Sequence, residues 1–237
     1  MTAAGPLWIF GYGSLMWRPG FAFRSQSVAR LRGCHRALCI RSTHYRGTLT
    51  RPGLVFGLDW GGVCDGIAFE IAPEDAERVL HAVRARELIY GVYREARVAI
   101  TLLSSEPKTD GHRVVDAVTF IAERAHPSYT GTLPLAVQAG IIRGARGVAG
   151  SNLAYLVNTL QHLRELTLRD RAIERVGTMI AAHALSNGAG GEVHSARVEA
   201  LSGNWKPKRS RAGKRHRVQR RFEQSRFGHR KALGLWR

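Results

Sequence analysis

The chain has 237 residues and 44% hydrophobic content, which suits one large domain or a domain with an appendage. It contains no apolar run of about 18 residues and no basic region before its first apolar stretch, so neither a transmembrane helix nor a signal peptide is expected. The formal net charge is +18, and the three cysteines lack a C-x-x-C pair, which favours reduced thiols in the cytoplasm over a disulfide framework or a zinc site.

Short apolar runs in the first third of the chain predict strands. Residues 7–10 form a buried strand by this criterion, and residues 29–41 form a second one. Residues 54–60 and 66–71 are predicted to pair as a hairpin, because a glycine-rich stretch at 61–65 is typical of a turn.

Helical patterns follow in the rest of the chain. Residues 73–86 are amphipathic, with a proline in the first turn, and predict a helix. A strand pair is expected at 93–103 and 113–122, with its turn at 108–111. Three further helices are predicted at 133–143, 151–166 and 170–185, followed by a glycine-rich break at 187–191. Strands followed by helices, without a βαβ repeat, indicate an α+β fold.

The last 35 residues differ in composition from the rest. Residues 203–237 contain 13 Lys and Arg against one acidic residue, whereas residues 1–202 contain 23 basic and 17 acidic residues. The stretch 206–221 has too few apolar residues to bury a core. We therefore expect a domain over 1–186, a linker or terminal element over 187–202, and a basic, disordered tail over 203–237.

The first predicted strand ends in a glycine-rich turn, G-Y-G-S-L at residues 11–15. Gly11 and Gly13 permit unusual backbone angles and close approach of a ligand to the main chain. The turn either only redirects the chain or aims several N–H groups at one anion, as a nest does. It matches neither the P-loop pattern nor G-x-G-x-x-G, so it gives no support to nucleotide binding.

Three other side chains are candidates for chemistry. Glu87, after the predicted helix, is either a surface ion-pair partner or a partly desolvated carboxylate that could act as a base. Arg46 is either a solvated loop residue or a charge partner for a carboxylate. Tyr129 lies in the S-Y-T-G stretch at 128–131. Further along, Ser151 is a predicted N-cap, and Asn152 and Tyr155 share a helix face.

Several blocks of the sequence occur in the order seen in one enzyme family. They are W-I-F-G-Y-G-S-L-M-W-R-P-G-F at 8–21, G-C-H-R at 33–36, H-Y-R-G-T at 44–48, P-G-L-V at 52–55, G-G-V-C-D-G at 61–66, R-E at 86–87 with Gly91 and Tyr93 downstream, and G-S-N-L-A-Y-L at 150–156. In these blocks the chain resembles the ChaC-type γ-glutamylcyclotransferases from residue 7 to about residue 176.

The resemblance implies a fold, a reaction and a site. The fold is a small mixed β-barrel with helices packed around it, and the reaction is cleavage of glutathione to 5-oxoproline and cysteinylglycine without a cofactor or metal. Glu87 matches the catalytic glutamate, the general base. Tyr12, Gly13, Ser14 and Leu15 match the glycine-rich loop, whose N–H groups would bind the substrate α-carboxylate, the developing oxyanion, or both. Arg46 and Tyr129 are counted with the substrate-binding residues.

Two alternatives stay open on the sequence alone. The same loop and glutamate would serve other γ-glutamyl amino acids or amines as substrates. Alternatively, the protein is a nucleic-acid-binding module, since the basic charges of 203–237, interleaved with aromatic residues, suit phosphate backbones and base stacking. An anionic membrane surface is a further partner of the same charge.

Overall fold

The computed structural model describes residues 5–103, 113–186 and 201. The sequence predictions for the turn at 108–111, the break at 187–191 and the tail at 203–237 lie outside these residues. The strands are β1 (Leu7–Gly11), β2 (Ser25–Ser42), β3 (Gly53–Ile71), β4 (Tyr93–Leu102), β5 (Val114–Ala122), β6 (Arg146–Gly147) and β7 (Gly150–Ser151), and the helices are α1 (Ala76–Glu87), α2 (Leu135–Gly144), α3 (Asn152–Glu165) and α4 (Arg171–Ser186).

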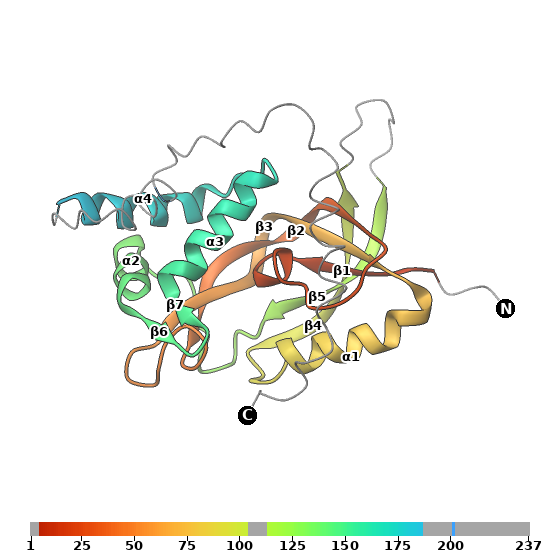
Figure 1. The fold of residues 1–237 in the computed structure, drawn as a ribbon, viewed down its shortest axis with the longest axis horizontal. Helices are drawn as coiled ribbons and strands as arrows, with labels where there is room; N and C mark the ends of the chain where they lie inside the picture. The colour runs from red at the N-terminus through yellow and green to blue at the C-terminus, as the bar shows by residue number, and fades with distance from the viewer. Residues whose placement is uncertain (1–4, 104–112, 187–200, 202–237) are drawn as a thin grey trace, which may run out of the picture. The chain divides into compact units, whose positions relative to one another are not determined.

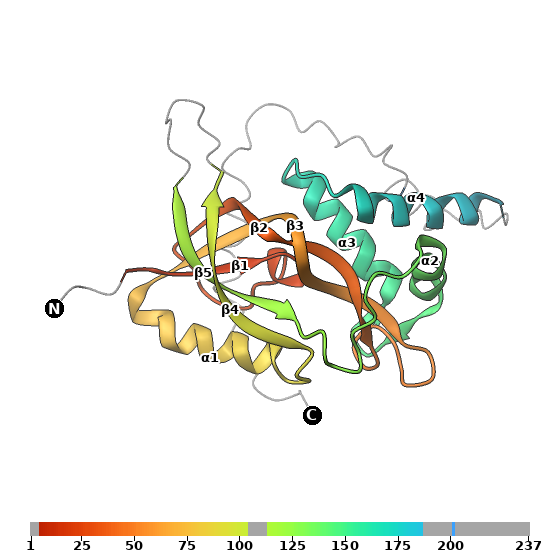
Figure 2. The ribbon, with the colours of Figure 1, turned by 180° about the vertical axis from the view of Figure 1, so that it is seen from behind.

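The first five strands form a closed barrel in the order β1-β3-β2-β4-β5, and β1 closes it by pairing in parallel with β5. Helix α1 lies along one side of the barrel, whereas α2, α3 and α4 gather on the other side (Figures 1 and 2). The predicted α+β class, a small barrel with surrounding helices, is confirmed.

The predicted hairpin at 54–71 is wrong, because these residues form the single long strand β3. Gly61 and Gly62, which suggested a turn, do take positive φ values of 93° and 75°. On the paired strand β2, however, Gly33 has a φ of 87° and the register shifts between Arg32 and Cys34. Both strands therefore bend together, and their pairing continues on either side of the bend.

The predicted helices agree with the structure within a few residues. Pro73 opens a 3-10 turn that leads into α1, and α1 ends at Glu87 itself. Ser151 caps α3, as predicted, since its Oγ accepts a hydrogen bond from the Ala154 N–H at 3.1 Å. The cap fixes where α3 begins.

Two apolar clusters hold the helices to the barrel. One joins barrel residues such as Phe10 and Leu58 to Leu156 of α3 and Val176 of α4. The other joins Phe69 and neighbouring barrel residues to the buried face of α1. Helix α1 packs on one side of the barrel and α3 on the other. This packing fixes the position of each helix end relative to the strands.

The cysteines Cys34, Cys39 and Cys64 are buried and free. Burial raises the pKa of Cys39 to about 12 and that of Cys64 to about 11, so both remain thiols at neutral pH. Among the helices of the described residues, none combines the length and apolarity needed to cross a bilayer.

Candidate active site

The glycine-rich loop leaves β1 and forms a short 3-10 turn at Ser14–Met16. The turn is closed by the Met16 N–H, which donates to the Gly13 carbonyl at 2.9 Å. Within the described residues, the N–H groups of Gly13, Ser14 and Leu15 donate to no protein acceptor. These donors stand ready for a bound anion, as expected at the start of a helical turn.

Glu87 is the last residue of α1, and its side chain is 16% exposed. Burial raises the pKa of this carboxyl, while the neighbouring Arg86 guanidinium opposes the shift. Arg86 Nε lies 3.1 Å from Glu87 Oε1. A carboxylate with a raised pKa holds a proton more readily than an exposed one, which suits a general base.

One small pocket brings the loop and this carboxylate together. Its lining consists of Tyr12, Gly13, Ser14, Leu15, Phe56, Glu87, Tyr93, Phe120 and Tyr155. The four predicted loop residues and the predicted base thus share one site. Sequence reasoning missed the other four members of the lining, all of them aromatic, although Tyr93 and Tyr155 stood inside blocks that the family resemblance uses.

Hydrogen bonds to the barrel hold the three pocket tyrosines. The hydroxyl of Tyr12 donates to the Phe120 carbonyl at 2.8 Å, and that of Tyr93 donates to the Phe56 carbonyl at 2.7 Å. The Tyr155 hydroxyl accepts from the Phe56 N–H at 3.3 Å. Burial raises the pKa of all three phenols, so Glu87 is the group in this lining that can accept a proton near neutral pH.

Arg86 ties the loop to the end of α1. Its Nη2 donates to Ser14 Oγ at 2.8 Å, and its Nη1 donates to the carbonyls of Arg18 and Pro19 at 2.7 and 3.2 Å. Arg86, which directly precedes Glu87, therefore fixes the position of the loop relative to Glu87. The distance between the base and the N–H donors of the loop depends on these contacts of Arg86.

Arg46 lies next to the pocket but outside its lining. Its guanidinium carbon is 5.2 Å from the ring centroid of Tyr155, and its Nη1 donates to the Ala149 carbonyl at 2.6 Å. Burial lowers the pKa of Arg46. Its guanidinium thus lies over the ring of a residue that lines the pocket.

The structure does not bring Tyr129 to this pocket. Its hydroxyl donates to Asp59 Oδ2 at 2.7 Å, and Arg124 Nε donates to the other carboxylate oxygen at the same distance. Asp59 is buried, at 4% exposure. These contacts assign Tyr129 a place in a polar network between β3 and the segment after β5.

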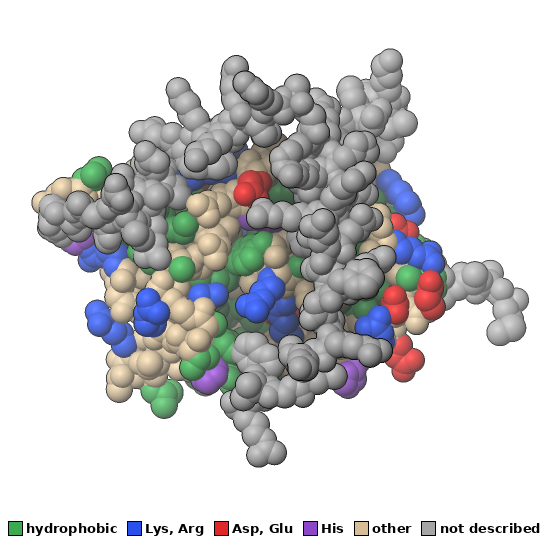
Figure 3. Space-filling view, viewed as in Figure 1, with side chains coloured by type: hydrophobic (Ala, Val, Ile, Leu, Met, Phe, Trp, Pro, Cys, Tyr) green, Lys and Arg blue, Asp and Glu red, His purple; other side chains and the backbone are tan. Residues whose placement is uncertain are grey.

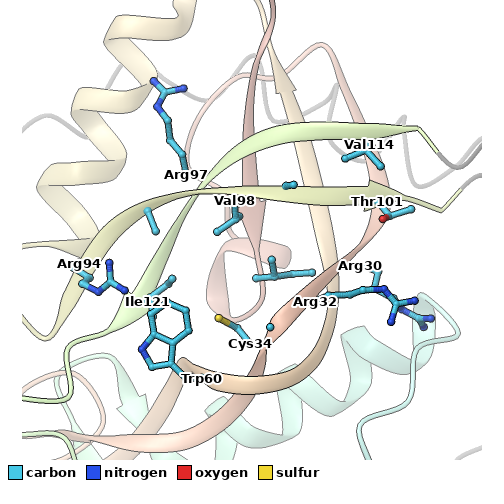
Figure 4. Close-up of a pocket in the computed structure, with 14 residues that line it drawn as sticks. Arg30, Arg32, Cys34, Trp60, Arg94, Arg97, Val98, Thr101, Val114 and Ile121 are labelled. Carbon is cyan, nitrogen blue, oxygen red and sulfur yellow. The ribbon is translucent and has the colours of Figure 1, made fainter.

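A larger open hollow of about 610 Å³ lies between β2 and β4 (Figure 4). It exists because β2 pairs with β4 over only three residue pairs, Ala29–Leu31 with Ile100–Leu102. Four arginines line it, including Arg94, whose guanidinium carbon lies 5.2 Å from the ring centroid of Trp60, and no carboxylate does among the described residues. It offers no base, so the smaller pocket is the candidate active site.

On the face seen in Figure 3, Lys and Arg side chains are scattered among the described residues, while most of the visible acidic side chains lie toward α1. A surface of this kind favours anionic ligands on approach.

Comparisons with known proteins identify the family and support the fold. A family model described as ChaC-like protein matches residues 7–183. The glutathione-specific gamma-glutamylcyclotransferase of Escherichia coli is 38% identical over 166 residues, covering 70% of this chain and 69% of the relative. Glutathione-specific gamma-glutamylcyclotransferase 1 of Homo sapiens is 34% identical over 153 residues, covering 64% and 67%. A crystal structure of a glutathione-specific cyclotransferase from yeast superimposes with a TM-score of 0.65 at 22% identity, over 76% of this chain and 99% of that one, which supports the fold.

Proposed function

This chain belongs to the ChaC-like protein family, and we propose that it is a glutathione-specific γ-glutamylcyclotransferase that releases 5-oxoproline and cysteinylglycine. The observation that carries the proposal is the shared pocket of Glu87 and the loop Tyr12–Leu15. A carboxylate with a raised pKa lines this pocket together with three residues whose N–H groups donate to no acceptor among the described residues. This pair of features suits a substrate that carries both an ammonium and a carboxylate on one carbon.

The chemistry is a transfer within the substrate. The α-amine attacks the γ-carbonyl carbon, a new C–N bond closes the five-membered ring, and the bond to the cysteinyl nitrogen breaks. The α-amine is an ammonium at neutral pH and must lose two of its three protons to become the N–H of the ring. Glu87 takes each proton in turn and returns it to the cysteinyl nitrogen, which leaves as an ammonium. No water is consumed and no cofactor is required. Holding the substrate in a folded, near-attack conformation contributes much of the rate enhancement.

The loop would bind the anionic end of the substrate. N–H groups of Gly13, Ser14 and Leu15 would donate hydrogen bonds to the α-carboxylate and so bring the α-amine toward Glu87. Arg46 adds positive charge from behind Tyr155. The aromatic walls Phe56 and Phe120 exclude water, which strengthens each of these electrostatic contacts.

A cytoplasmic location fits this substrate. Glutathione is held reduced in the cytosol, and the three buried free thiols of the chain suit the same compartment. Contact with nucleic acid or an anionic surface through 203–237 stays a prediction about residues outside the described ones.

The test is release of 5-oxoproline and cysteinylglycine from reduced glutathione. Glu87→Gln keeps the size of the side chain and removes the base, so turnover should fall by about 100-fold or more. Glu77→Gln, an exposed change in the first turn of the same helix, is the matched control and should keep wild-type activity.

γ-Glutamyl-alanine runs in parallel as a second substrate. If the wild type turns over γ-glutamyl-alanine but not glutathione, the proposed mechanism stands and glutathione is refuted as the substrate. Turnover of neither compound would refute the proposed function.

A further inference from the structure

Arg36 of β2 is 4% exposed and lies behind the glycine-rich loop. Its Nε donates to the Tyr12 carbonyl, and its Nη2 donates to the Asp65 carbonyl of β3. Its Nη1 donates to Asp170 Oδ2 at 2.9 Å. One buried guanidinium thus joins the loop, the barrel and the start of α4.

The carbonyl that Arg36 binds belongs to the same peptide group as the Gly13 N–H. The peptide bonds between the described residues are trans, and in a trans peptide the C=O and N–H point in opposite directions. The Gly13 N–H therefore points away from Arg36, and Gly13 lines the pocket. Within the described residues this N–H has no acceptor of its own.

A cation bound to a carbonyl polarises the whole peptide group. The N–H at its other end then becomes a stronger donor, as in chains of hydrogen bonds that strengthen one another. Screening by water is weak here because the guanidinium is buried. The charge of Arg36 therefore strengthens the Gly13 N–H as a hydrogen-bond donor to a ligand in the pocket.

Burying a charge costs free energy that only well-placed partners offset. An apolar side chain of the same volume would hold these elements together without that cost. Asp170 supplies the counter-charge, and its other oxygen, Oδ1, accepts from the Ile173 N–H at 3.3 Å in the first turn of α4. The charge at this point therefore does something that packing alone would not do, because it acts on the peptide group whose carbonyl it binds.

We propose that Arg36 is a positioning residue that sets the affinity of the glycine-rich loop for the α-carboxylate of the substrate, by polarising the Tyr12–Gly13 peptide. The proposal rests on the proposed function, because it assumes that the loop binds this carboxylate. It assigns Arg36 no contact with the reacting atoms.

The test compares two ligands that differ only in the carboxylate. Glutathione and γ-aminobutyryl-cysteinylglycine, which lacks the α-carboxylate, are titrated calorimetrically into the Glu87→Gln protein, in which turnover is blocked. The same titrations are run with Arg36→Lys and Asp170→Asn added to Glu87→Gln. The readout is the dissociation constant of γ-aminobutyryl-cysteinylglycine divided by that of glutathione. This ratio is large when the loop binds the α-carboxylate tightly, and a general loosening of the pocket, which affects both ligands, cancels in it.

Arg36→Lys should reduce this ratio by about tenfold, roughly the effect of losing one charge-assisted hydrogen bond, because an ammonium lacks the fork of N–H donors with which Arg36 holds the Tyr12 carbonyl, the Asp65 carbonyl and Asp170 at once. Asp170→Asn should leave the ratio unchanged or raise it, because it removes the counter-charge and keeps the guanidinium. A purely structural tie would predict the same decrease for both variants, since both break the contact between Arg36 and Asp170. Asp170→Asn also keeps the test decisive where Arg36→Lys does not fold.

Arg30→Lys is the matched control. Arg30 lies on the same strand and pairs with Asp65 through its side chain at 2.7 Å, but it does not reach the loop. A ratio that Arg36→Lys leaves unchanged, or that Asp170→Asn lowers, would overturn the role of Arg36 alone. Failure of the otherwise unmodified Glu87→Gln protein to bind glutathione, together with a wild type that does not turn it over, would overturn the proposed function and this inference with it.

Discussion

Arg86 Nε lies 3.1 Å from Oε1 of Glu87, so the proposed base has a cation as its immediate neighbour in the chain. Burial raises the pKa of Glu87, and Arg86 pulls it in the opposite direction. The net shift is upward. The working pKa of the base is thus a balance between desolvation and one specific charge.

Arg86→Gln should raise the pKa of Glu87 further. Without the guanidinium, the pKa of Glu87 rises, and the base is deprotonated only at higher pH. The acidic limb of the pH profile of kcat/KM for glutathione should therefore shift to higher pH. The position of the limb is the readout, because the loss of the contact with Ser14 will also change the absolute rate.

Arg84→Gln is the control for this prediction. Arg84 lies on the same turn of α1 but pairs with Glu95 of β4 at 2.6 Å. Its removal should leave the limb where it is. A limb that stays in place in Arg86→Gln, or moves to lower pH, would show that Glu87 is not the group that titrates.

The raised pKa of Glu87 also predicts an effect on stability. A carboxyl whose pKa is higher in the folded than in the unfolded protein favours folding while protonated, and this contribution is lost as the pH rises through the folded-state pKa. Glu87→Gln, which stays neutral, should therefore have a higher free energy of unfolding than wild type at pH 8. Urea unfolding at pH 8 and near pH 4 measures this, and the difference should shrink at the lower pH. Equal stabilities at both values would contradict a buried, destabilised carboxylate.

The sequence predicted the local features of the fold well and the shape of the barrel poorly. Helix α1 and the cap at Ser151 depend on residues a few positions apart, and their signals are local. The single strand β3 depends on Gly33 of the partner strand bending in step with Gly61 and Gly62. Glycines that mark a turn and glycines that mark a shared bend look alike in one sequence.

The site divides in the same way. The loop and Glu87 were found through short motifs, and the structure brings them into one pocket. Tyr155 meets Phe56 only because α3 packs on β3, with 99 positions between them in the chain. Arg36 reaches the loop across 24 positions. Contacts of this range have no periodic signal, so residue patterns could not assign these side chains to the site.

Tyr129→Phe tests the one predicted substrate-binding residue that lies away from the pocket. Burial would raise the pKa of Asp59, but hydrogen bonds from Tyr129 and Arg124 lower it below its usual value. Loss of the hydroxyl should reduce the free energy of unfolding by about 1–3 kcal/mol at pH 7 and leave the KM for glutathione within about twofold. Because the pKa of Asp59 is lowered in the folded state, the loss should shrink as the pH falls through that pKa.

Thermal unfolding across pH and steady-state kinetics measure both quantities. The opposite pattern, a raised KM with unchanged stability, would assign Tyr129 to the substrate after all. In that case the site would extend from the pocket toward the segment after β5.

Asn152 provides the last prediction, because it links α3 to the main chain of the barrel. Its Nδ2 donates to the Leu54 carbonyl at 2.7 Å, and its Oδ1 accepts from the Leu54 N–H at 2.6 Å. The side chain is fully buried. Asn152→Ala leaves two buried main-chain groups unpaired, so the free energy of unfolding should fall by about 2–4 kcal/mol, measured by urea denaturation. Asn158→Ala, an exposed change on the same helix, should alter it by less than about 0.5 kcal/mol.

Tyr155 lies less than one turn further along α3, so in Asn152→Ala the KM for glutathione should rise together with the loss of stability. A stability loss as small as that of Asn158→Ala would mean that the pairing with Leu54 does not hold α3 in place.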